Sequence, residues 1–237
     1  MRRGWLRTWL ARSGAQAEVT VALPARVAND AGRALMRDAP SAGLARALCF
    51  LVVGFATLMR SSSSVPLARS DVRRTESDVV VRPRTIKGGG INPVLPNPKV
   101  FPRKEAWWMH RALEAWEAAR DREWRLAGAL PPLADAPRSL WALPGDAASG
   151  DSRCAERWLQ EALAHLGVLA PMGGKYTPHC LRKGGASAFA AEGGSLGAIC
   201  YLGDWAVNSP VPEKHYIDRS VLADPFSKLF FSFRVRR

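Results

Sequence analysis

The stretch Thr177-Pro-His-Cys-Leu-Arg-Lys-Gly-Gly-Ala-Ser187 carries the strongest local signal in this chain of 237 residues. A threonine followed by proline is typical of a helix start, where the threonine caps free amides and the proline fits the first turn. We expect this helix to end at Gly193-Gly194. His179 and Arg182 lie three residues apart in its first turn, so both side chains leave one face. The free amides at the same helix end favour a bound phosphate.

Two shorter patterns follow, Leu202-Gly-Asp-Trp205 and Lys214-His-Tyr-Ile217. Tyr216 is one of only three tyrosines, and its phenol needs neighbouring cations or a base before it can act as a nucleophile. Each pattern alone would describe ordinary structure: a capping histidine with a solvated arginine, a core tryptophan and a packed tyrosine. Their order instead favours a site for phosphoryl transfer onto tyrosine.

In this order and context, the three segments resemble the C-terminal half of the catalytic domain of tyrosine recombinases, the phage-integrase family, in its eukaryotic transposon-like form. Arg60 ends an apolar helix just before the expected strands, where the family has its first catalytic arginine. Lys87 in Arg84-Thr-Ile-Lys87 falls between two hairpin strands, where the family has its lysine. The resemblance spans about residues 45–225.

The resemblance implies a mainly α-helical α+β fold with a small antiparallel β-sheet. It also implies that Tyr216 attacks a DNA phosphodiester and forms a 3′-phosphotyrosyl link. Arg60 and Arg182 would bind the phosphate oxygens and balance the charge of the transition state. The implied catalytic set is Arg60, Lys87, His179, Arg182, Trp205 and Tyr216.

The remaining roles and partners also come from the resemblance. His179 is the expected general base, Trp205 a hydrogen-bond donor to the phosphate, and Lys87 the acid that protonates the departing 5′-oxygen. Neither a metal ion nor a cofactor is implied. The expected partner is double-stranded DNA, bound by a homo-oligomer that is a tetramer during strand exchange. An intracellular location is implied, nuclear if the source is eukaryotic.

Composition supports a polyanionic partner. Lysine and arginine number 34 against 21 aspartate and glutamate residues, giving a net charge of +13. Phosphate neutralisation supplies most non-specific affinity for nucleic acid, although basic membrane-surface and ribosomal proteins share such a charge. The four cysteines form no C-x-x-C pair, so we expect reduced thiols rather than disulfides or a zinc site. The apolar run of residues 47–59 is too short to span a membrane.

Three regions are expected along the chain: a basic flank at residues 1–44, a catalytic domain at residues 45–225 and an apolar, basic tail at residues 226–237. The arginine-rich start also has the composition of an organellar transit peptide. The phenylalanine-rich tail suits docking on a neighbour or folding back on its own domain.

Within the domain, the patterns predict the following elements: an apolar helix over 45–60, a sheet over 71–102 with strand pieces at 79–81, 94–95 and 100–101, an amphipathic helix over 103–127 anchored by tryptophans, a surface loop over 128–152, and helices over 151–166 and 195–202.

Three departures from the family pattern keep alternatives open. Ser63 stands where the family has an acid, Pro66 lies in the next expected helix, and the interval from Trp205 to Tyr216 is longer than usual. These departures favour an inactive DNA-binding remnant of a mobile element. A topoisomerase-like nicking-closing enzyme would share the tyrosine chemistry. A basic structural or organellar RNA-binding protein would explain the charge but not the ordered series of residues.

Overall fold

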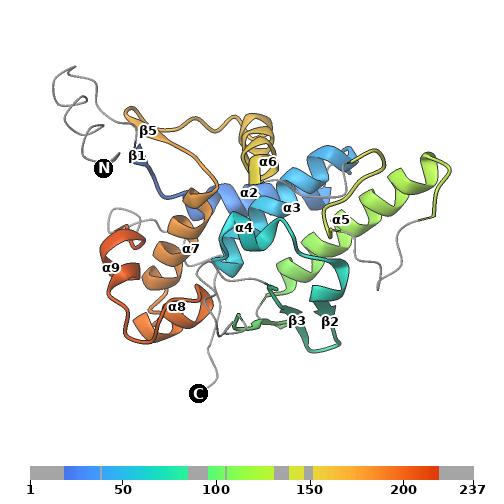
Figure 1. The fold of residues 1–237 in the computed structure, drawn as a ribbon. Helices are drawn as coiled ribbons and strands as arrows, with labels where there is room; N and C mark the ends of the chain where they lie inside the picture. Colours follow the sequence, from blue (N-terminus) through green and yellow to red (C-terminus); the bar gives the residue numbers. More distant parts are fainter. Residues whose placement is uncertain are drawn as a thin grey trace, which may run out of the picture.

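The computed structural model describes residues 19–37, 39–84, 96–104, 106–130, 139–146 and 152–218. These residues form a mainly helical α+β fold with a small antiparallel sheet, which confirms the predicted fold class (Figure 1). The helices are α2 (Ala25–Arg37), α3 (Ala42–Thr57), α4 (Ser61–Ser64), α5 (Trp107–Leu126), α6 (Ser152–His165), α7 (His179–Ala191), α8 (Leu196–Leu202) and α9 (Val211–His215). The strands are β1 (Val19–Thr20), β2 (Val72–Arg74), β3 (Asp78–Val81), β4 (Lys99–Pro102) and β5 (Gly174–Lys175), with a 3-10 turn at Arg69–Asp71.

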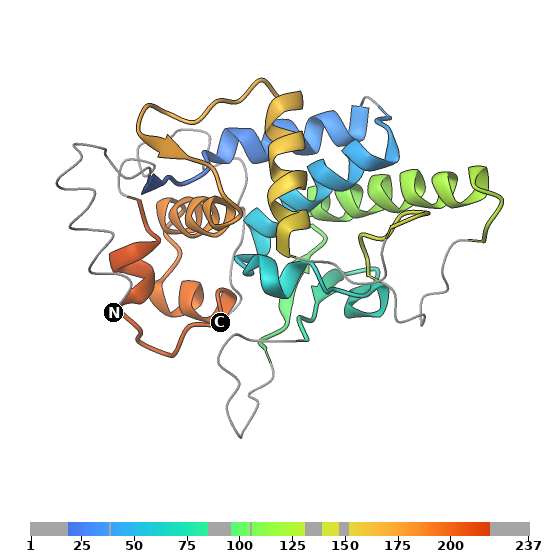
Figure 2. The same ribbon diagram turned by 45° about the horizontal axis from the view of Figure 1, so that its top comes forward.

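Helix α3 is the centre of the core. It is apolar on nearly every face, so it is stable only when other elements surround it. Helices α2, α5, α6 and α7 pack around it, and Figure 2 shows α6, in yellow, crossing the blue helices. The Ser41 hydroxyl accepts a hydrogen bond from the Leu44 amide at its start. The predicted apolar helix is confirmed but ends at Thr57, because Leu58 adopts a left-handed conformation with φ of 54°.

The core also includes residues upstream of the expected domain boundary at residue 45. Helix α2 buries Val27, Ala31 and Leu35 in the same cluster as α3. The two-residue strand β1 pairs in parallel with β5, and the Leu23 amide donates to the Cys180 carbonyl in α7. Residue 45 is therefore not an edge of this core.

The sheet has the strand order β2-β3-β4, and both pairings are antiparallel. Val79 pairs with Phe101 and Val81 with Lys99, and the side chains of β3 alternate between buried and partly exposed. This pattern is the period of two that a half-buried strand requires. The predicted sheet is confirmed for residues 72–81 and 99–102. The segment with Lys87 between the hairpin strands and the strand piece at 94–95 lie outside the described residues.

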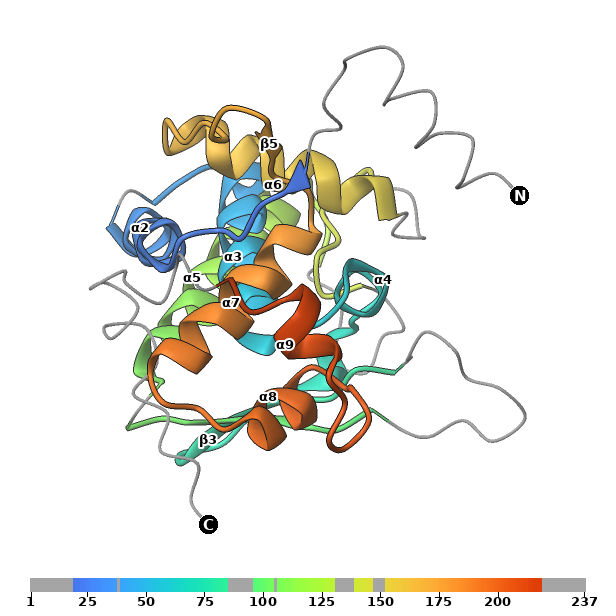
Figure 3. The same cartoon turned by 90° about the vertical axis from the view of Figure 1, so that its left-hand side faces the viewer.

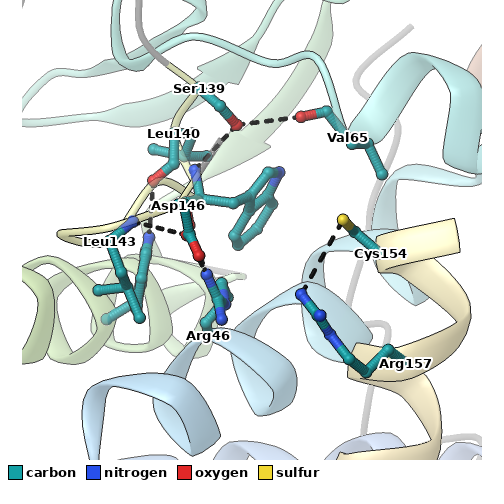
Figure 4. Close-up of polar contacts among 10 residues, drawn as sticks. Arg46, Val65, Ser139, Leu140, Leu143, Asp146, Cys154 and Arg157 are labelled. Carbon is teal, nitrogen blue, oxygen red and sulfur yellow. Dashed lines mark hydrogen bonds and ion pairs between the residues drawn. The ribbon is translucent and has the colours of Figure 1, made fainter. Parts of the chain in front are cut away.

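The loop predicted over residues 128–152 is only partly a surface loop. Leu140 and Trp141 are buried, and the Trp141 indole donates to the Ser64 carbonyl at 2.7 Å. Figure 4 shows how the segment is attached: Arg46 of α3 bonds to Asp146, and the Ser139 hydroxyl donates to the Val65 carbonyl. The prediction of a surface position was wrong here because this segment, although rich in small residues and prolines, contains Trp141, whose side chain is buried in the core.

The tryptophans of α5 do not share one environment. Trp116 and Trp124 are buried, as predicted, and the Trp116 indole donates to the Leu140 carbonyl at 3.2 Å. Trp107, at the start of the helix, is 56% exposed, so its prediction as a core anchor was wrong. All four cysteines of the chain are free thiols. Within the part of the chain that the structure describes, no helix is long and apolar enough to cross a membrane.

Two adjacent glycines allow α7 to lie directly against the backbone of α3 and of residue 23. A Cβ atom on Gly184 would lie 2.2 Å from the Leu23 carbonyl oxygen. A Cβ atom on Gly185 would lie 2.1 Å from the Phe55 carbonyl oxygen and 2.4 Å from the Leu58 side chain. Neither glycine has a positive φ, so space rather than conformation requires them. This close approach sets the position of the helix that carries His179 and Arg182.

Gly185→Ala tests this close approach. Because backbone cannot move aside as a flexible side chain can, we expect the free energy of unfolding to fall by about 1–3 kcal/mol or more. Urea unfolding followed by tryptophan fluorescence measures the change. The matched control is Gly32→Ala in α2, where the added Cβ would lie 4.0 Å from the nearest atom, on the Val52 side chain. The control should gain up to about 1 kcal/mol from reduced backbone freedom in the unfolded chain. Equal unfolding midpoints for the two variants would contradict the packing argument.

Candidate active site

A cavity of about 590 Å³ opens where four segments distant in sequence meet. Its walls are the residues around the start of α4, Glu156 of α6, the first turn of α7, and Tyr216 just after α9. Figure 3 shows α4, α7 and α9 beside one another on this side of the molecule. The lining includes two guanidinium groups, one imidazole, one phenol and one carboxylate, so it is mainly cationic.

Arg182 is the most deeply buried charge at this cavity, with an exposed fraction of 1%. Its two Nη atoms donate to the carbonyls of Leu58 and Gly203, and its guanidinium stacks on the Trp205 ring, 3.6 Å from the centroid. It therefore joins the end of α3, helix α7 and the end of α8.

The charge of Arg182 is nevertheless incompletely balanced. Arg182 takes part in none of the ion pairs found among the described residues, and its buried Nε has no hydrogen-bond partner there. Burial and the neighbouring Arg60 lower the Arg182 pKa to about 10, while Tyr216 and Asp204 oppose the decrease. The group thus remains charged at neutral pH. A buried cation held by neutral dipoles, with a free donor, is suited to binding an anion.

The Gly-x-Trp pattern has a packing explanation. A Cβ atom on Gly203 would lie 1.8 Å from the Trp205 ring, so only glycine lets the indole fold back over this turn. Between them, Asp204 has a φ of 52°. In this arrangement the Gly203 carbonyl and the Trp205 ring both contact Arg182. The indole Nε1 is buried and has no hydrogen-bond partner within the described part of the chain.

A buried ion pair attaches the sheet to the same turn. Lys99 of β4 is fully buried and donates to the Asp204 carboxylate at 2.8 Å, which also accepts from the Asn97 amide at 3.0 Å. Burial lowers the pKa of Lys99, and Asp204 partly restores it. Removing one partner of such a pair leaves an uncompensated charge, so the two residues are required together. The candidate lysine Lys87 lies outside the described residues.

Tyr216 is placed against the other candidate residues. Its ring centroid lies 4.9 Å from that of His179 and 4.7 Å from that of Trp205, and Arg182 lies 5.2 Å from it. The long interval after Trp205 is taken up by α9, which begins next to Pro210 and includes Pro212. The amides of Tyr216 and Ile217 both donate to the Pro212 carbonyl. The extra length therefore does not move the tyrosine away from the cavity.

His179 is the first residue of α7 and lies at the rim of the cavity. Burial lowers its pKa from the usual value, and Arg182, Lys183 and Arg60 lower it further. The imidazole is therefore neutral at neutral pH, which leaves a nitrogen lone pair free. The expected Thr177 cap is wrong: Pro178 is at the capping position, and the Thr177 hydroxyl pairs with that of Thr20 at 3.2 Å.

The structure brings together five of the six predicted site residues. Arg60, His179, Arg182 and Tyr216 line the cavity, and Trp205 lies behind Arg182 and Tyr216. Arg60 reaches the cavity because it follows the left-handed Leu58 and precedes α4, outside any helix.

Sequence reasoning missed the carboxylate in this wall, Glu156. Gln160, one turn later on α6, donates to Glu156 at 3.2 Å and to the Tyr176 carbonyl at 2.8 Å. The bond to Tyr176 connects α6 to the segment that leads into α7. Nothing in the sequence distinguishes Glu156 from the other acidic residues on helix surfaces, so no local pattern would have found it.

Comparison with solved structures identifies the fold as that of the tyrosine recombinase catalytic domain. XerH site-specific recombinase bound to palindromic difH substrate, in a post-cleavage complex, superposes with a TM-score of 0.56 at 14% identity, covering 80% of this chain and 47% of that one. The pre-cleavage XerH complex with difH substrate gives 0.57 at 14% identity, covering 80% and 48%. XerA recombinase gives 0.59 at 19% identity, covering 91% and 67%.

The chain spans about half the length of the XerH structures that it matches. No protein-family model matches the sequence, and no curated protein sequence matches it. At these identities the likeness extends to the fold. The fold predicted from the sequence is thereby confirmed.

The electrostatics of the cavity predict how His179 titrates. By NMR, its imidazole should titrate below the usual value of about 6.5. Arg60→Gln should raise this pKa, because it removes a positive charge that disfavours the imidazolium ion. In the wild type, the unfolded chain binds the His179 proton at a higher pH than the folded chain does. Protonation of His179 therefore lowers the free energy of unfolding as the pH drops below about 6.5.

The internal control for this titration is His110, whose pKa is lowered by burial and by Arg103 rather than by Arg60. Its midpoint should not change in Arg60→Gln. A His179 midpoint at or above the usual value, or one insensitive to Arg60, would contradict the proposed electrostatic coupling of these residues.

Proposed function

We propose that this protein is a site-specific DNA recombinase that cleaves and rejoins strands through a covalent 3′-phosphotyrosyl intermediate. The observation that carries the proposal is the placement of Tyr216 against His179 and Arg182 at one cationic cavity. A tyrosine that only filled the core would not need a neutral imidazole and a buried, incompletely paired guanidinium beside it. The recombinase fold supports the same conclusion.

In the proposed reaction, the Tyr216 hydroxyl oxygen bonds to the phosphorus of a DNA phosphodiester and the bond to the 5′-oxygen breaks. The phenol proton passes to His179, whose lowered pKa keeps it in the basic form. The 5′-oxygen leaves as a hydroxyl after it takes a proton, for which Lys87 is the proposed donor. Attack by a 5′-hydroxyl on the phosphotyrosine reverses each step and needs no energy source.

Arg182 and Arg60 are the proposed ligands of the non-bridging phosphate oxygens. Arg182 has its Nη atoms fixed by two carbonyls, so its guanidinium is oriented before any substrate binds. Preorganised donors of this kind stabilise developing charge without reorganisation during the reaction. Lysine would be a poor replacement, because it lacks the planar fork that bonds both carbonyls at once. The free Trp205 indole N–H is a further proposed donor.

The proposed partner is double-stranded DNA. The net charge of +13 supports binding to a polyanion, and the XerH structures of this fold are complexes with difH substrate. A tetramer on DNA, a metal-independent reaction, an origin in an integrating mobile element and an intracellular location, nuclear if the source is eukaryotic, complete the proposal. These parts rest on the sequence resemblance.

The second candidate function is DNA binding without cleavage, as in a decayed mobile-element integrase. Ser63 stands where an acid would support the site, and α4, which contains it, is only one turn long. Both features would weaken control of Arg60. The assembled contacts of His179, Arg182, Trp205 and Tyr216 favour the active form over this alternative.

A covalent-trapping assay tests the proposal. Purified protein is incubated with nicked DNA pools in which cleavage releases a short fragment, so the covalent product cannot be religated. We expect a DNA-linked band on a denaturing gel for the wild type and none for Tyr216→Phe, which lacks the nucleophilic oxygen. Tyr201→Phe is the matched control, because Tyr201 is half exposed and lies outside the cavity lining.

The remaining outcomes, read together with a native gel and a relaxation assay on supercoiled DNA, discriminate between the functions. A band that persists in Tyr216→Phe would contradict the assigned nucleophile. DNA that is shifted on a native gel but never linked would favour the non-cleaving alternative. Relaxation of supercoiled DNA without any sequence preference among the linked products would indicate a topoisomerase-like enzyme instead.

A further inference from the structure

We propose that Ser187 is a positioning residue that holds the Tyr216 segment against α7 in register with His179. The inference rests on the proposed function, because it assigns a role in delivering the nucleophile. Ser187 ends the sequence stretch that contains His179 and Arg182, yet no chemistry was assigned to it from the sequence. Ser187 is fully buried and does not line the cavity, so it would act through Tyr216.

The Ser187 hydroxyl bonds to both sides of Ile217. Its oxygen accepts a hydrogen bond from the Asp218 amide at 2.7 Å and lies 3.1 Å from the Tyr216 carbonyl, to which it donates. It also lies 2.8 Å from the Lys183 carbonyl of its own helix. A hydroxyl has one proton and two acceptor sites, so the two carbonyls share the proton while the Asp218 bond is always available.

Burial makes these bonds effective. Ser187 has no exposed surface, so water cannot replace the hydroxyl as a partner for the two backbone groups. Hydrogen bonds are stronger in such a low-dielectric environment, and unmade ones are correspondingly costly. A serine inside a helix normally satisfies itself on the preceding turn. Here the same side chain also bonds to a separate segment of the chain, at Tyr216 and Asp218, and these bonds are not needed to satisfy a serine within a helix.

The attachment at Ser187 sets the position of the nucleophile, Tyr216, relative to the base, His179. His179 and Ser187 are eight residues apart on one helix, which is about 12 Å along its axis. The Tyr216 backbone is held at Ser187, and the Tyr216 ring reaches back to within 4.9 Å of the His179 ring. The base and the nucleophile are therefore both positioned by the same rigid element, helix α7. The short helix α9 supplies the other restraint, through the Pro212 carbonyl.

A positioning role and a merely structural role predict different results for Ser187→Ala. A structural role lowers the melting temperature and changes nothing else once the protein is folded. A positioning role lowers the rate of covalent adduct formation at saturating DNA, while DNA affinity stays unchanged. Misplacement of a reacting group by about 1 Å costs on the order of 10²-fold in rate, so we expect a decrease of about 10- to 100-fold.

The matched control is Ser139→Ala. The Ser139 hydroxyl also makes one donated and one accepted bond, to the Val65 carbonyl at 3.1 Å and from the Trp141 amide at 3.2 Å, but it is not part of the cavity. Each variant therefore loses one donor and one acceptor, including a bond that joins separate segments: the bond to Val65 in Ser139→Ala and the bonds to Tyr216 and Asp218 in Ser187→Ala. Rates are compared on the nicked DNA pool at a temperature where circular dichroism shows all proteins folded. Hydrogen exchange of the amides of residues 216–218 is measured on the same samples.

We expect Ser187→Ala alone to slow adduct formation and to speed exchange of these amides, with the Kd for DNA unchanged. Adduct formation at the wild-type rate in Ser187→Ala, or an equal decrease in Ser139→Ala, would overturn the positioning role. If the wild type itself forms no adduct, the proposed function fails, and the exchange measurement still decides whether Ser187 holds the Tyr216 segment against α7. Unchanged exchange at residues 216–218 in Ser187→Ala would then show that it does not.

Discussion

The burial of Arg182 is the constraint on which the site depends. Its guanidinium is held by the carbonyls that end α3 and α8 and by the face of Trp205, so one side chain fixes three parts of the chain. That arrangement requires α7 to approach α3 more closely than any residue with a Cβ would permit, which explains Gly184 and Gly185. It also requires the compact turn at Gly203. The glycines and the arginine of the sequence pattern therefore belong to one packing arrangement.

The packing arrangement around Arg182 also determines the electrostatics of the cavity. Carbonyl dipoles orient the buried cation but do not cancel its charge, and the second cation, Arg60, lies close enough to lower its pKa. Burial, together with these two cations and Lys183, lowers the pKa of His179 and so favours the neutral imidazole. A phosphate would neutralise the cations, and the imidazole would accept the proton that a phenol must lose. Binding and base catalysis would thus follow from the same arrangement of charge.

The sequence was sufficient for the fold class and for most of the site, because His179, Arg182, Gly203 and Trp205 act through local spacing along helices and turns. It was insufficient where an effect depends on packing between distant segments. Helix α2 lacked a persuasive pattern, yet its small residues fit against α3. Trp141 stood in a stretch that reads as a surface loop, and Glu156 and Ser187 acquire their positions only when α6, α7 and the Tyr216 segment meet.

The most direct measurement is to identify the atom that carries the DNA. Covalent adduct is digested with nuclease and protease, and the nucleotide-bearing peptide is sequenced by tandem mass spectrometry. The account predicts a 3′-linked nucleotide on Tyr216. The competing hydroxyls in the lining of the same cavity belong to Ser61, Ser62 and Thr177. Nucleotide found on any of these three residues, or on Tyr201, would contradict the account even if strand cleavage itself were observed.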